Sequence, residues 1–462
     1  MGLLVSEILP ESDGGASRGV SLPVRIAHAL AQRTIWHLNS TARGGGVADL
    51  LEKSIRLHNE SGLRARWLVL TGGPGFFAVT KRLHHRLHGS PDPAGPLGPA
   101  ERDVYESTTR RQAREVLELV APGDLCVLHD PQTLGLAPHL VAAGLDVAWR
   151  CHIGTAARSA VVRDTWDFLD PYLRAPARCV FTAERYAPPG LVGQRDKVVV
   201  LRPSIDPAAR KNRPMTRTAA HDRLHAIGLQ PGPGRPTAAR TARIVQDRLL
   251  PADAPMVLQV SRWDPLKDMA GVLRGFADHV APARDDVHLV LAGPEPDDIP
   301  DDPEGGRILR ELRGVWEALD RPVRERVHLV TLSLSDPGAN ADSVNALQRR
   351  ADIVVQKSLR EGFGLTVTEA MWKGKAIVAS AVGGITDQIR DGHEGALVRN
   401  PHDLAAFGRS ILRLLADGDL RERYGTAAHR RCTKEFLIYR EFMDYCSLYT
   451  GLLRRTPTAT HP

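Results

Sequence analysis

Two charged segments each follow a stretch that is typical of a buried strand. The first is Ser261-Arg262-Trp263-Asp264-Pro265-Leu266-Lys267, at the end of a predicted strand, Met256–Ser261. Arg262 offers two parallel N–H donors and Lys267 a compact positive charge, and together they suit a diphosphate that gains negative charge as it leaves. A surface loop with solvated cations has the same composition, so the residue types alone leave both interpretations open.

The second segment, Arg360–Glu369, leads from a predicted strand into a predicted helix. Backbone amides at Gly364 and Leu365 would point at an anion on the helix axis, where the helix dipole favours negative charge. The carboxylates of Glu361 and Glu369 can accept hydrogen bonds from a hydroxyl-rich ligand, and an acidic residue that holds a ribose diol is common in nucleotide sites. The alternative is that Glu361 caps the helix and Glu369 is solvated.

A third feature is the triplet Gly44-Gly45-Gly46, which precedes a predicted helix, Val47–Asn59. Without side chains, such a turn lets backbone N–H groups approach a phosphate closely. The spacing is neither G-x-G-x-x-G nor that of a P-loop, and a plain tight turn is compatible with it as well.

Short β-branched runs that alternate with helical patterns predict parallel sheets covered by helices on both faces. In the first half of the chain we predict strands at Thr34–Asn39, Ala65–Thr71, Asp124–His129, Val147–His152, Cys179–Thr182 and Lys197–Arg202. In the second half we predict strands at Met256–Ser261, Val287–Ala292, Val327–Leu332, Asp352–Gln356, Ala376–Ser380 and Gly395–Val398. The predicted fold class is therefore α/β, with two Rossmann-like, doubly wound domains that face a shared cleft, because open α/β sheets bind ligands at the carboxyl ends of their strands.

The chain is long enough for two domains, since its 462 residues exceed the roughly 250–300 residues at which single cores stop growing. The strand pattern also starts twice. We predict an N-terminal extension at residues 1–32 and a first domain at 33–205. A linker or surface insertion follows at 206–250, then a second domain at 251–432. A terminal helix at 433–462 is expected to pack back on the first domain.

The composition is that of an ordinary globular enzyme, with 42% hydrophobic and 25% charged residues. No apolar run reaches the ~18 residues of a membrane span, and the start of the chain lacks a signal-peptide pattern, so we expect a cytoplasmic protein without a membrane partner. The net charge of +7 favours an anionic ligand. Much of the excess lies in the Arg-rich stretch Pro231–Arg248, which predicts a surface insertion and no nucleic-acid partner, because aromatic residues are not interleaved with its cations.

No metal site is predicted from the cysteines or histidines. Five scattered cysteines lack C-x-x-C spacing and predict reduced thiols. The run His84, His85 and His88 has no carboxylate or cysteine at ligand spacing, so these side chains are expected to be solvated.

The ordered motifs of the chain resemble those of the retaining GT-B glycosyltransferases of family 4, and especially those of the trehalose synthases, which join a nucleotide-activated glucose to glucose. The similarity extends from about Trp36 to Val398. Its landmarks are His37–Ala42, Gly44–Ala48, Phe76–Arg82, His129–Gln132, Trp149–His152, Pro203–Pro207, Val260–Arg262, Asp301–Gly305, Val344–Arg349 and, as the strongest block, Gln356–Lys375.

The resemblance implies roles for the charged segments of the second domain. Arg262 and Lys267 would hold the donor diphosphate and stabilise its departure. Glu361 would accept a hydroxyl of the donor sugar, and Glu369 would bind the ribose hydroxyls. Further donor contacts would come from the glycine loop and from the start of the helix that follows Glu361, namely Gly44, Gly45, Gly46, Gly364, Leu365 and Thr366.

The resemblance also implies roles in the first domain. His152 would lie by the donor sugar and reach the acceptor side, and Asp130, Lys81 and Arg82 would line the acceptor pocket. Two departures fall here: Gly154 stands where the relatives usually carry an acidic residue, and Arg43 where they tend to carry an aromatic one. They leave the identity of the acceptor open.

The implied reaction is transfer of a hexosyl unit, expected to be glucosyl, to a sugar acceptor with retention and an α linkage. The expected donor is UDP-, ADP- or GDP-glucose or a derivative, with no cofactor and no metal, because fixed cations already serve the leaving group. Three alternatives stay open: an amino-sugar or aminocyclitol acceptor from secondary metabolism, a trehalose phosphorylase, and a non-catalytic sugar or nucleotide sensor. Formation of a homodimer is also left open.

Overall fold

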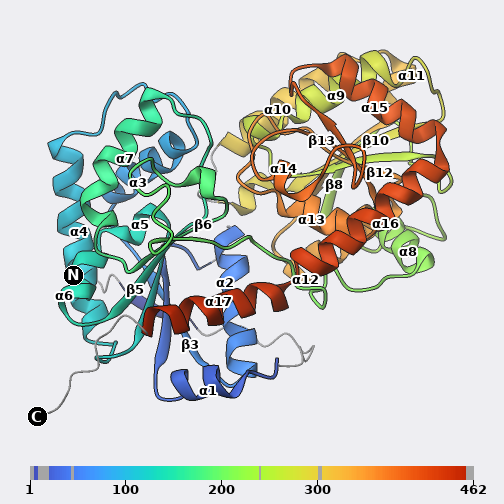
Figure 1. The fold of residues 1–462 in the computed structure, drawn as a ribbon. Coiled ribbons are helices and arrows are strands. Elements are labelled where there is room, and N and C mark those ends of the chain that lie inside the picture. Colours follow the sequence, from blue (N-terminus) through green and yellow to red (C-terminus); the bar gives the residue numbers. More distant parts are fainter. Residues whose placement is uncertain (1–4, 9–19, 43–45, 239–240, 300–303, 454–462) are drawn as a thin grey trace, which may run out of the picture. The chain divides into compact units, whose positions relative to one another are not determined.

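The computed structural model describes residues 5–8, 20–42, 46–238, 241–299 and 304–453. The chain forms two compact units. Unit 1 contains Met1–Ser204 and Ile438–Pro462, and unit 2 contains Ile205–Leu437. Each unit has its own sheet with helices on both faces, as Figure 1 shows.

The sheet of unit 1 has the strand order β1-β3-β2-β4-β5-β6-β7. Its neighbouring strands are parallel, except that β1 runs antiparallel to β3. Because β3 lies on one side of β2 and β4 on the other, the winding reverses between β2 and β4. The strands are β1 (Val5–Ile8), β2 (Thr34–Asn39), β3 (Arg64–Leu70), β4 (Leu125–His129), β5 (Asp146–Cys151), β6 (Arg178–Phe181) and β7 (Val198–Val200).

Helices cover both faces of this sheet. One face packs against α3 to α7 around buried aromatic residues such as Tyr105 and Trp149. The other face packs against α1, α2 and α17, where Leu30, Leu57 and Tyr449 are buried together. The helices of unit 1 are α1 (Val24–Leu30), α2 (Gly46–Glu60), α3 (Pro74–Leu87), α4 (Pro99–Leu117), α5 (Asp130–Leu134), α6 (Ala137–Ala142), α7 (Ala160–Leu173), the 3-10 turn η1 (Glu184–Tyr186) and α17 (Ile438–Leu453).

The sheet of unit 2 has the order β14-β13-β12-β9-β10-β11-β8. It is parallel apart from β8, which runs antiparallel to β11. The winding reverses between β9 and β12. The strands are β8 (Ala242–Val245), β9 (Met256–Val260), β10 (His288–Pro294), β11 (Val327–Leu332), β12 (Ile353–Gln356), β13 (Ala376–Ser380) and β14 (Ala396–Val398).

The helices of unit 2 also form two layers. α8, α12, α13 and α16 bury one face, and α9, α10 and α15 bury the other. They are α8 (Arg217–Ala226), η3 (Pro265–Lys267), α9 (Met269–His279), η4 (Pro296–Asp298), α10 (Glu304–Glu317), α11 (Arg321–Arg324), α12 (Pro337–Arg350), α13 (Leu365–Trp372), α14 (Ile385–Gln388), α15 (Leu404–Ala416) and α16 (Gly418–Glu435). In the described part of the chain, no helix is long and apolar enough to span a membrane.

The parallel strands lie where the sequence predicts them, with ends that differ by a residue or two. The two antiparallel edge strands, β1 and β8, are not predicted. Apolar runs mark strands that are buried on both faces, whereas an edge strand such as β8 is only partly buried and carries a weaker pattern.

Residues 206–250 are part of unit 2, and the prediction of a linker or surface insertion is corrected here. α8 packs against α12 and buries Leu224, while Arg223 donates hydrogen bonds to Ser343 Oγ at 2.9 Å and to the Ala339 carbonyl at 2.7 Å. The segment also supplies β8 to the sheet. Its sequence pattern is weak because α8 buries only Ala220 and Leu224 within a polar helix.

The chain ends also differ from the predicted boundaries. Within residues 1–32, β1 joins the sheet and α1 buries Leu30 against unit 1. Near the other end, α16 continues past residue 433, and Cys432 and Phe436 belong to the core of unit 2. The helix assigned to unit 1, α17, starts at Ile438.

Candidate functional site

Charged and polar side chains of unit 2 gather at the carboxyl ends of β9 and β12. These two parallel strands are neighbours, and the winding of the sheet reverses between them. Arg262 and Lys267 follow β9, and Ser358 and Glu361 follow β12. In open α/β sheets, such a reversal point is where ligands bind, so the fold places the two predicted charged segments at one site.

Lys267 and Glu361 are in direct contact. Lys267 Nζ lies 2.6 Å from Glu361 Oε2, and Ser358 Oγ donates to the same oxygen at 3.2 Å. The side chains are 19% and 9% exposed, so both are shielded but still reach solvent. A shielded ammonium that a carboxylate holds in place is suited to a polyanionic ligand, since it needs little reorganisation when the ligand binds.

Hydrogen bonds within the loop and from β9 hold the loop that carries Arg262. Asp264 Oδ1 accepts from the Leu266 backbone amide at 2.7 Å, and Gln259 Nε2 donates to the Lys267 carbonyl at 2.8 Å. Arg262 itself is 52% exposed, with Nη2 3.6 Å from Asp264 Oδ2. Its guanidinium therefore stands at the surface of the site, next to the more buried lysine.

The start of α13 borders the same site. Gly364 precedes the helix with φ of +91°, and a Cβ atom there would lie 3.2 Å from Glu361 Cγ. Thr366 Oγ1 donates to Gln356 Oε1 at 2.8 Å, which ties the first turn to the end of β12. The first amides of a helix have no acceptor within the helix and carry a partial positive charge, as Leu365 and Thr366 do here.

Glu369 is buried one turn further along α13. Its Oε1 pairs with Lys211 Nζ at 2.8 Å, and its Oε2 accepts from Gln348 Nε2 at 3.2 Å. Burial alone would raise the pKa of Glu369, but the charges of Lys211 and Lys373 outweigh burial and hold that pKa below its ordinary value. Lys211 lies in the segment predicted as a linker, so this contact could not be predicted from the sequence pattern.

In unit 1, Asp130 and His152 lie at the ends of β4 and β5. Asp130 begins α5 in a left-handed conformation with φ of 64°, and its Oδ1 accepts from the His152 backbone amide at 2.7 Å. Burial raises the pKa of Asp130 to about 7, although the His152 amide and Arg150 lower it. The carboxyl group fixes the backbone of His152 and so positions that imidazole.

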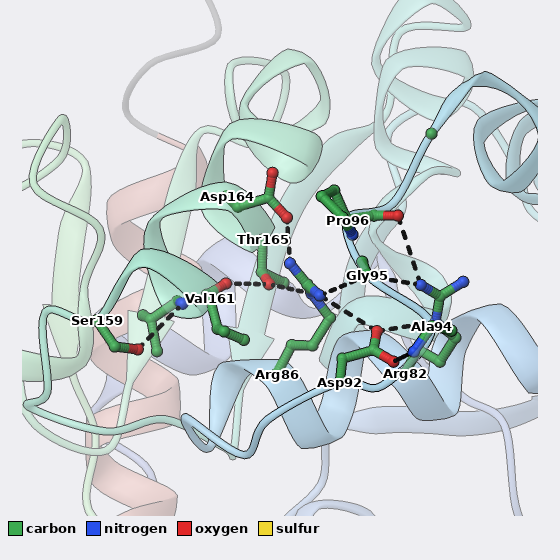
Figure 2. A network of polar contacts seen from close by, with 12 residues as sticks. Arg82, Arg86, Asp92, Ala94, Gly95, Pro96, Ser159, Val161, Asp164 and Thr165 are labelled. Atoms are coloured by element: carbon green, nitrogen blue, oxygen red, sulfur yellow. Dashed lines mark hydrogen bonds and ion pairs between the residues drawn. The ribbon is translucent and has the colours of Figure 1, made fainter.

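The other predicted acceptor residues, Lys81 and Arg82, lie on α3. Lys81 is exposed. Arg82 donates to Asp92 at 2.9 Å and to the Gly95 carbonyl at 2.9 Å, in the network of Figure 2. It also donates to Glu101 at 2.7 Å. These contacts fasten the loop between α3 and α4, and the acceptor role of Arg82 stays a prediction.

Glycines of unit 1 occupy two sequence motifs singled out above, the triplet at residues 44–46 and the segment after His152. Gly44 and Gly45, predicted to contact the phosphates, lie outside the described residues, and Gly46 is the first residue of α2. At Gly154, a Cβ atom would lie 2.8 Å from Tyr186 Cβ. The packing of Tyr186 therefore leaves no room at this position for the acidic residue that the resemblance places there in the relatives.

Both units match known family models. Residues 37–188 match "Trehalose synthase, N-terminal domain", and residues 241–431 match "Glycosyl transferases group 1". The chain is 33% identical to the trehalose synthase of Pyrococcus horikoshii over 427 residues, which cover 92% of each protein. It is also 33% identical to the trehalose synthase of Rubrobacter xylanophilus, over 93% of this chain and 92% of the relative.

The fold has solved counterparts at much lower sequence identity. One is "Trehalose-6-phosphate from E. coli bound with UDP-2-fluoro glucose", with a TM-score of 0.65 and 12% identity over 91% of this chain and 99% of that one. The fold is that of the GT-B glycosyltransferases, and the family model and the relatives show an enzyme that acts on sugars. Within that class, the chain belongs to the trehalose synthase family.

Proposed function

We propose that this protein transfers a glucosyl unit from a nucleoside diphosphate sugar to a sugar acceptor, with retention and formation of an α linkage. The observation that carries the proposal is the Lys267–Glu361 contact at the reversal point of the unit 2 sheet, beside the first turn of α13. A diphosphate needs cations and helix amides, and a glycosyl group needs hydroxyl acceptors. The site supplies both kinds of group from adjacent loops.

In this proposal, Lys267 and Arg262 bind the diphosphate, and the amides of Leu365 and Thr366 add a partial positive charge. Negative charge grows on the diphosphate as its bond to the anomeric carbon breaks. Preorganised cations stabilise that charge, which is the kind of term that dominates many enzyme mechanisms. The acceptor oxygen attacks from the face that the phosphate leaves, and the departing phosphate oxygen takes the acceptor's proton.

The carboxylates orient the donor. Glu361 keeps an oxygen for a sugar hydroxyl while it holds Lys267. Glu369 accepts from the ribose hydroxyls beside its contacts with Lys211 and Gln348, since a carboxylate has about four acceptor sites. The proposed set also contains His152, the glycine loop at residues 44–46 and the acceptor-side residues Asp130, Lys81 and Arg82, all in unit 1. No cofactor or metal is part of the proposal.

The experiment is a product analysis. The full chain is incubated with UDP-, ADP- or GDP-glucose, with and without glucose or an amino-sugar acceptor, and products are identified by mass spectrometry and NMR. We expect acceptor-dependent release of nucleotide and an α-linked product, at the same rate in the presence of a metal chelator. Binding without release would indicate a sensor. Cleavage of trehalose by inorganic phosphate, with no use of nucleotide sugars, would indicate a phosphorylase.

A substitution tests the role of Lys267. Lys267→Ala removes the cation that meets the growing charge, so we expect kcat to fall by about 10²–10³-fold, as when one preorganised donor is lost. The matched control is Lys434→Ala, which removes an exposed lysine from the last turn of α16. Equal kcat values for the two variants would contradict the assigned role.

A further inference from the structure

Three buried imidazoles, one partly buried imidazole and one phenol form a continuous hydrogen-bonded chain through unit 1. His58 Nε2 lies 3.1 Å from Tyr449 Oη, and Tyr449 Oη lies 3.2 Å from His37 Nε2. His37 Nδ1 lies 3.0 Å from His129 Nε2, and His129 Nδ1 lies 2.8 Å from His152 Nε2. The chain joins α2, α17, β2 and β4 to the residue that follows β5.

The hydrogen-bonded chain ends, opposite His152, at the Ser54 carbonyl oxygen, which can only accept a hydrogen bond. His58 Nδ1 lies 2.5 Å from the Ser54 carbonyl oxygen, so this nitrogen carries a hydrogen. His58, Tyr449, His37 and His129 are at most 1% exposed, and solvent offers them no alternative partner. Burial lowers the pKa of each of the four imidazoles, to about 4 for His58, so all four are neutral near pH 7.

In a neutral imidazole, one nitrogen donates and the other accepts. Because His58 Nδ1 donates to Ser54, its Nε2 accepts from the Tyr449 hydroxyl. The Tyr449 oxygen then accepts from His37 Nε2, and His37 Nδ1 accepts from His129 Nε2. His129 Nδ1 in turn accepts from His152 Nε2, so every hydrogen in the chain is fixed from the Ser54 end.

The remaining atom is His152 Nδ1. It is buried and has no hydrogen-bond partner among the described residues. We propose that the chain Ser54–His58–Tyr449–His37–His129 sets the tautomer of His152, so that its Nδ1 is always an acceptor and receives a hydroxyl of the sugar substrate. His37, His58, His129 and Tyr449 are then positioning residues. This inference rests on the proposed function for the identity of the ligand, but not for the tautomer.

The tautomer is measured by long-range ¹H–¹⁵N NMR of the full chain labelled at histidine. The signals of His152 are identified by their loss in His152→Gln. We expect a protonated Nε2 and an unprotonated Nδ1 in the free protein, and a shift of the Nδ1 signal when trehalose is added. A protonated Nδ1 in the free protein would overturn the proposal. An Nδ1 signal that does not shift with saturating trehalose would show that a sugar hydroxyl is not its ligand.

Tyr449→Phe removes the hydroxyl and so interrupts the series of hydrogen bonds, while the shape of the side chain is preserved. His37 Nε2 loses its acceptor, so the opposite set of tautomers becomes accessible and the Nδ1–H form of His152 should appear. If the two tautomers of His152 are equally populated, substrate affinity falls about twofold, and it falls further as the population of the Nδ1–H tautomer rises. We therefore expect a loss in kcat/KM that grows with the population of the Nδ1–H form measured by NMR and is about twofold when that form holds half of the population.

The matched control is Tyr445→Phe, one turn earlier on α17. Tyr445 is also buried, and its ring centroid lies 5.6 Å from those of His37 and His58, but among the described residues its hydroxyl bonds to Arg150 and to none of the imidazoles. We expect the NMR pattern of His152 and the kcat/KM value to stay unchanged in this variant. A His152 tautomer that is the same in Tyr449→Phe as in the parent protein would contradict the proposal. Because the NMR readout needs no turnover, an inactive enzyme with the expected tautomer would refute the proposed function and leave the tautomer assignment intact.

Discussion

Lys267 and Glu361 meet because two neighbouring strands end at the same edge of one sheet. The contact is short and shielded, and Ser358 adds a hydrogen bond to the same carboxylate oxygen. The residue types were identifiable from sequence, but their contact depends on the pairing of β12 with β9, almost a hundred residues apart in the chain. The geometry of the site is therefore a property of the sheet as well as of the loops.

A substitution of Gly364 tests how closely this residue packs against the Glu361 side chain. Gly364→Ala places a side chain at φ of +91°, with its Cβ 3.2 Å from Glu361 Cγ. We expect a loss of about 1–2 kcal/mol in the free energy of unfolding, because the left-handed conformation is unfavourable for alanine. Activity should fall as well, since Glu361 is displaced. Denaturant unfolding and initial-rate measurements check both effects.

The matched control for that substitution is Gly314→Ala in α10. Here a Cβ atom would meet nothing within 4 Å, and the glycine lies inside a helix. Alanine should raise the free energy of unfolding by up to ~1 kcal/mol, because glycine is the poorer helix former. If the two alanine variants had the same stability, the strain assigned to residue 364 would be wrong.

Among the secondary structure elements, those with a regular apolar pattern could be predicted and those without it could not. The parallel strands are buried on both faces, and their apolar runs give both their number and their positions. α8 and β8 were missed because α8 is mostly polar and β8 lies at an edge. As a result Lys211, which precedes α8 and contacts Glu369, could not be assigned to the site.

Other contacts of the site could not be predicted because they join distant parts of the chain. Tyr449 contacts His37 across 412 residues, and Arg150 contacts Glu441 across 291. No local pattern encodes such pairs. His152 and Asp130 could be predicted because the family resemblance covers their motifs, whereas their distant partners belong to no such motif.

α17 is held in unit 1 by a buried ion pair. Arg150 Nη1 lies 2.8 Å from Glu441 Oε1, with side chains 2% and 4% exposed. Although burial alone would lower the pKa of Arg150, Tyr445 and Glu441 raise it above its ordinary value. Glu441→Ala leaves the guanidinium buried without its carboxylate, and we expect a loss of about 3–5 kcal/mol in the free energy of unfolding.

Asp444→Ala is the control on the same helix. Asp444 pairs with Arg440 one turn away, but its side chain is 42% exposed. Such a pair contributes only about 0.3–0.5 kcal/mol. Unfolding monitored by circular dichroism should separate the two variants clearly, and a Glu441→Ala protein as stable as Asp444→Ala would show that the buried pair does not hold α17.

Buried histidines in both units make the stability of the whole chain sensitive to acid. Burial lowers the pKa of His58 to about 4, against an ordinary value of 6.5, although the Ser54 carbonyl and Glu441 oppose the shift. In unit 2, His288 and His328 lie 2.9 Å apart, and burial lowers their pKa values to about 4 and about 3.

The sign of the effect follows from proton binding. Between about pH 4 and 6.5 the unfolded chain binds protons that the folded chain excludes, so stability is fully present above about pH 6.5 and is lost as the pH falls through this window. For His58 the shift is worth roughly 3 kcal/mol at the acid end. Denaturant unfolding at pH 7, 6, 5 and 4 measures the loss.

Two variants test whether protonation of His328 accounts for part of the loss in unfolding free energy at acid pH. His328→Gln can keep a hydrogen bond to Gln246 but cannot be protonated, so its stability should fall less between pH 6.5 and 4 than that of the parent. His402→Gln replaces an exposed histidine and should follow the parent curve. Identical pH dependence in all three proteins would show that the buried imidazoles do not govern the acid transition.

In the proposed mechanism, unit 2 binds the diphosphate of a nucleotide sugar between Lys267 and the first turn of α13. The decisive experiment is to soak crystals of the full-length protein separately with UDP, ADP and GDP and to determine each structure. We predict that the nucleotide that binds has its diphosphate within hydrogen-bond distance of Lys267 Nζ and at the amides of Leu365 and Thr366. A nucleotide bound elsewhere, with Lys267 still paired only with Glu361, would contradict the claim.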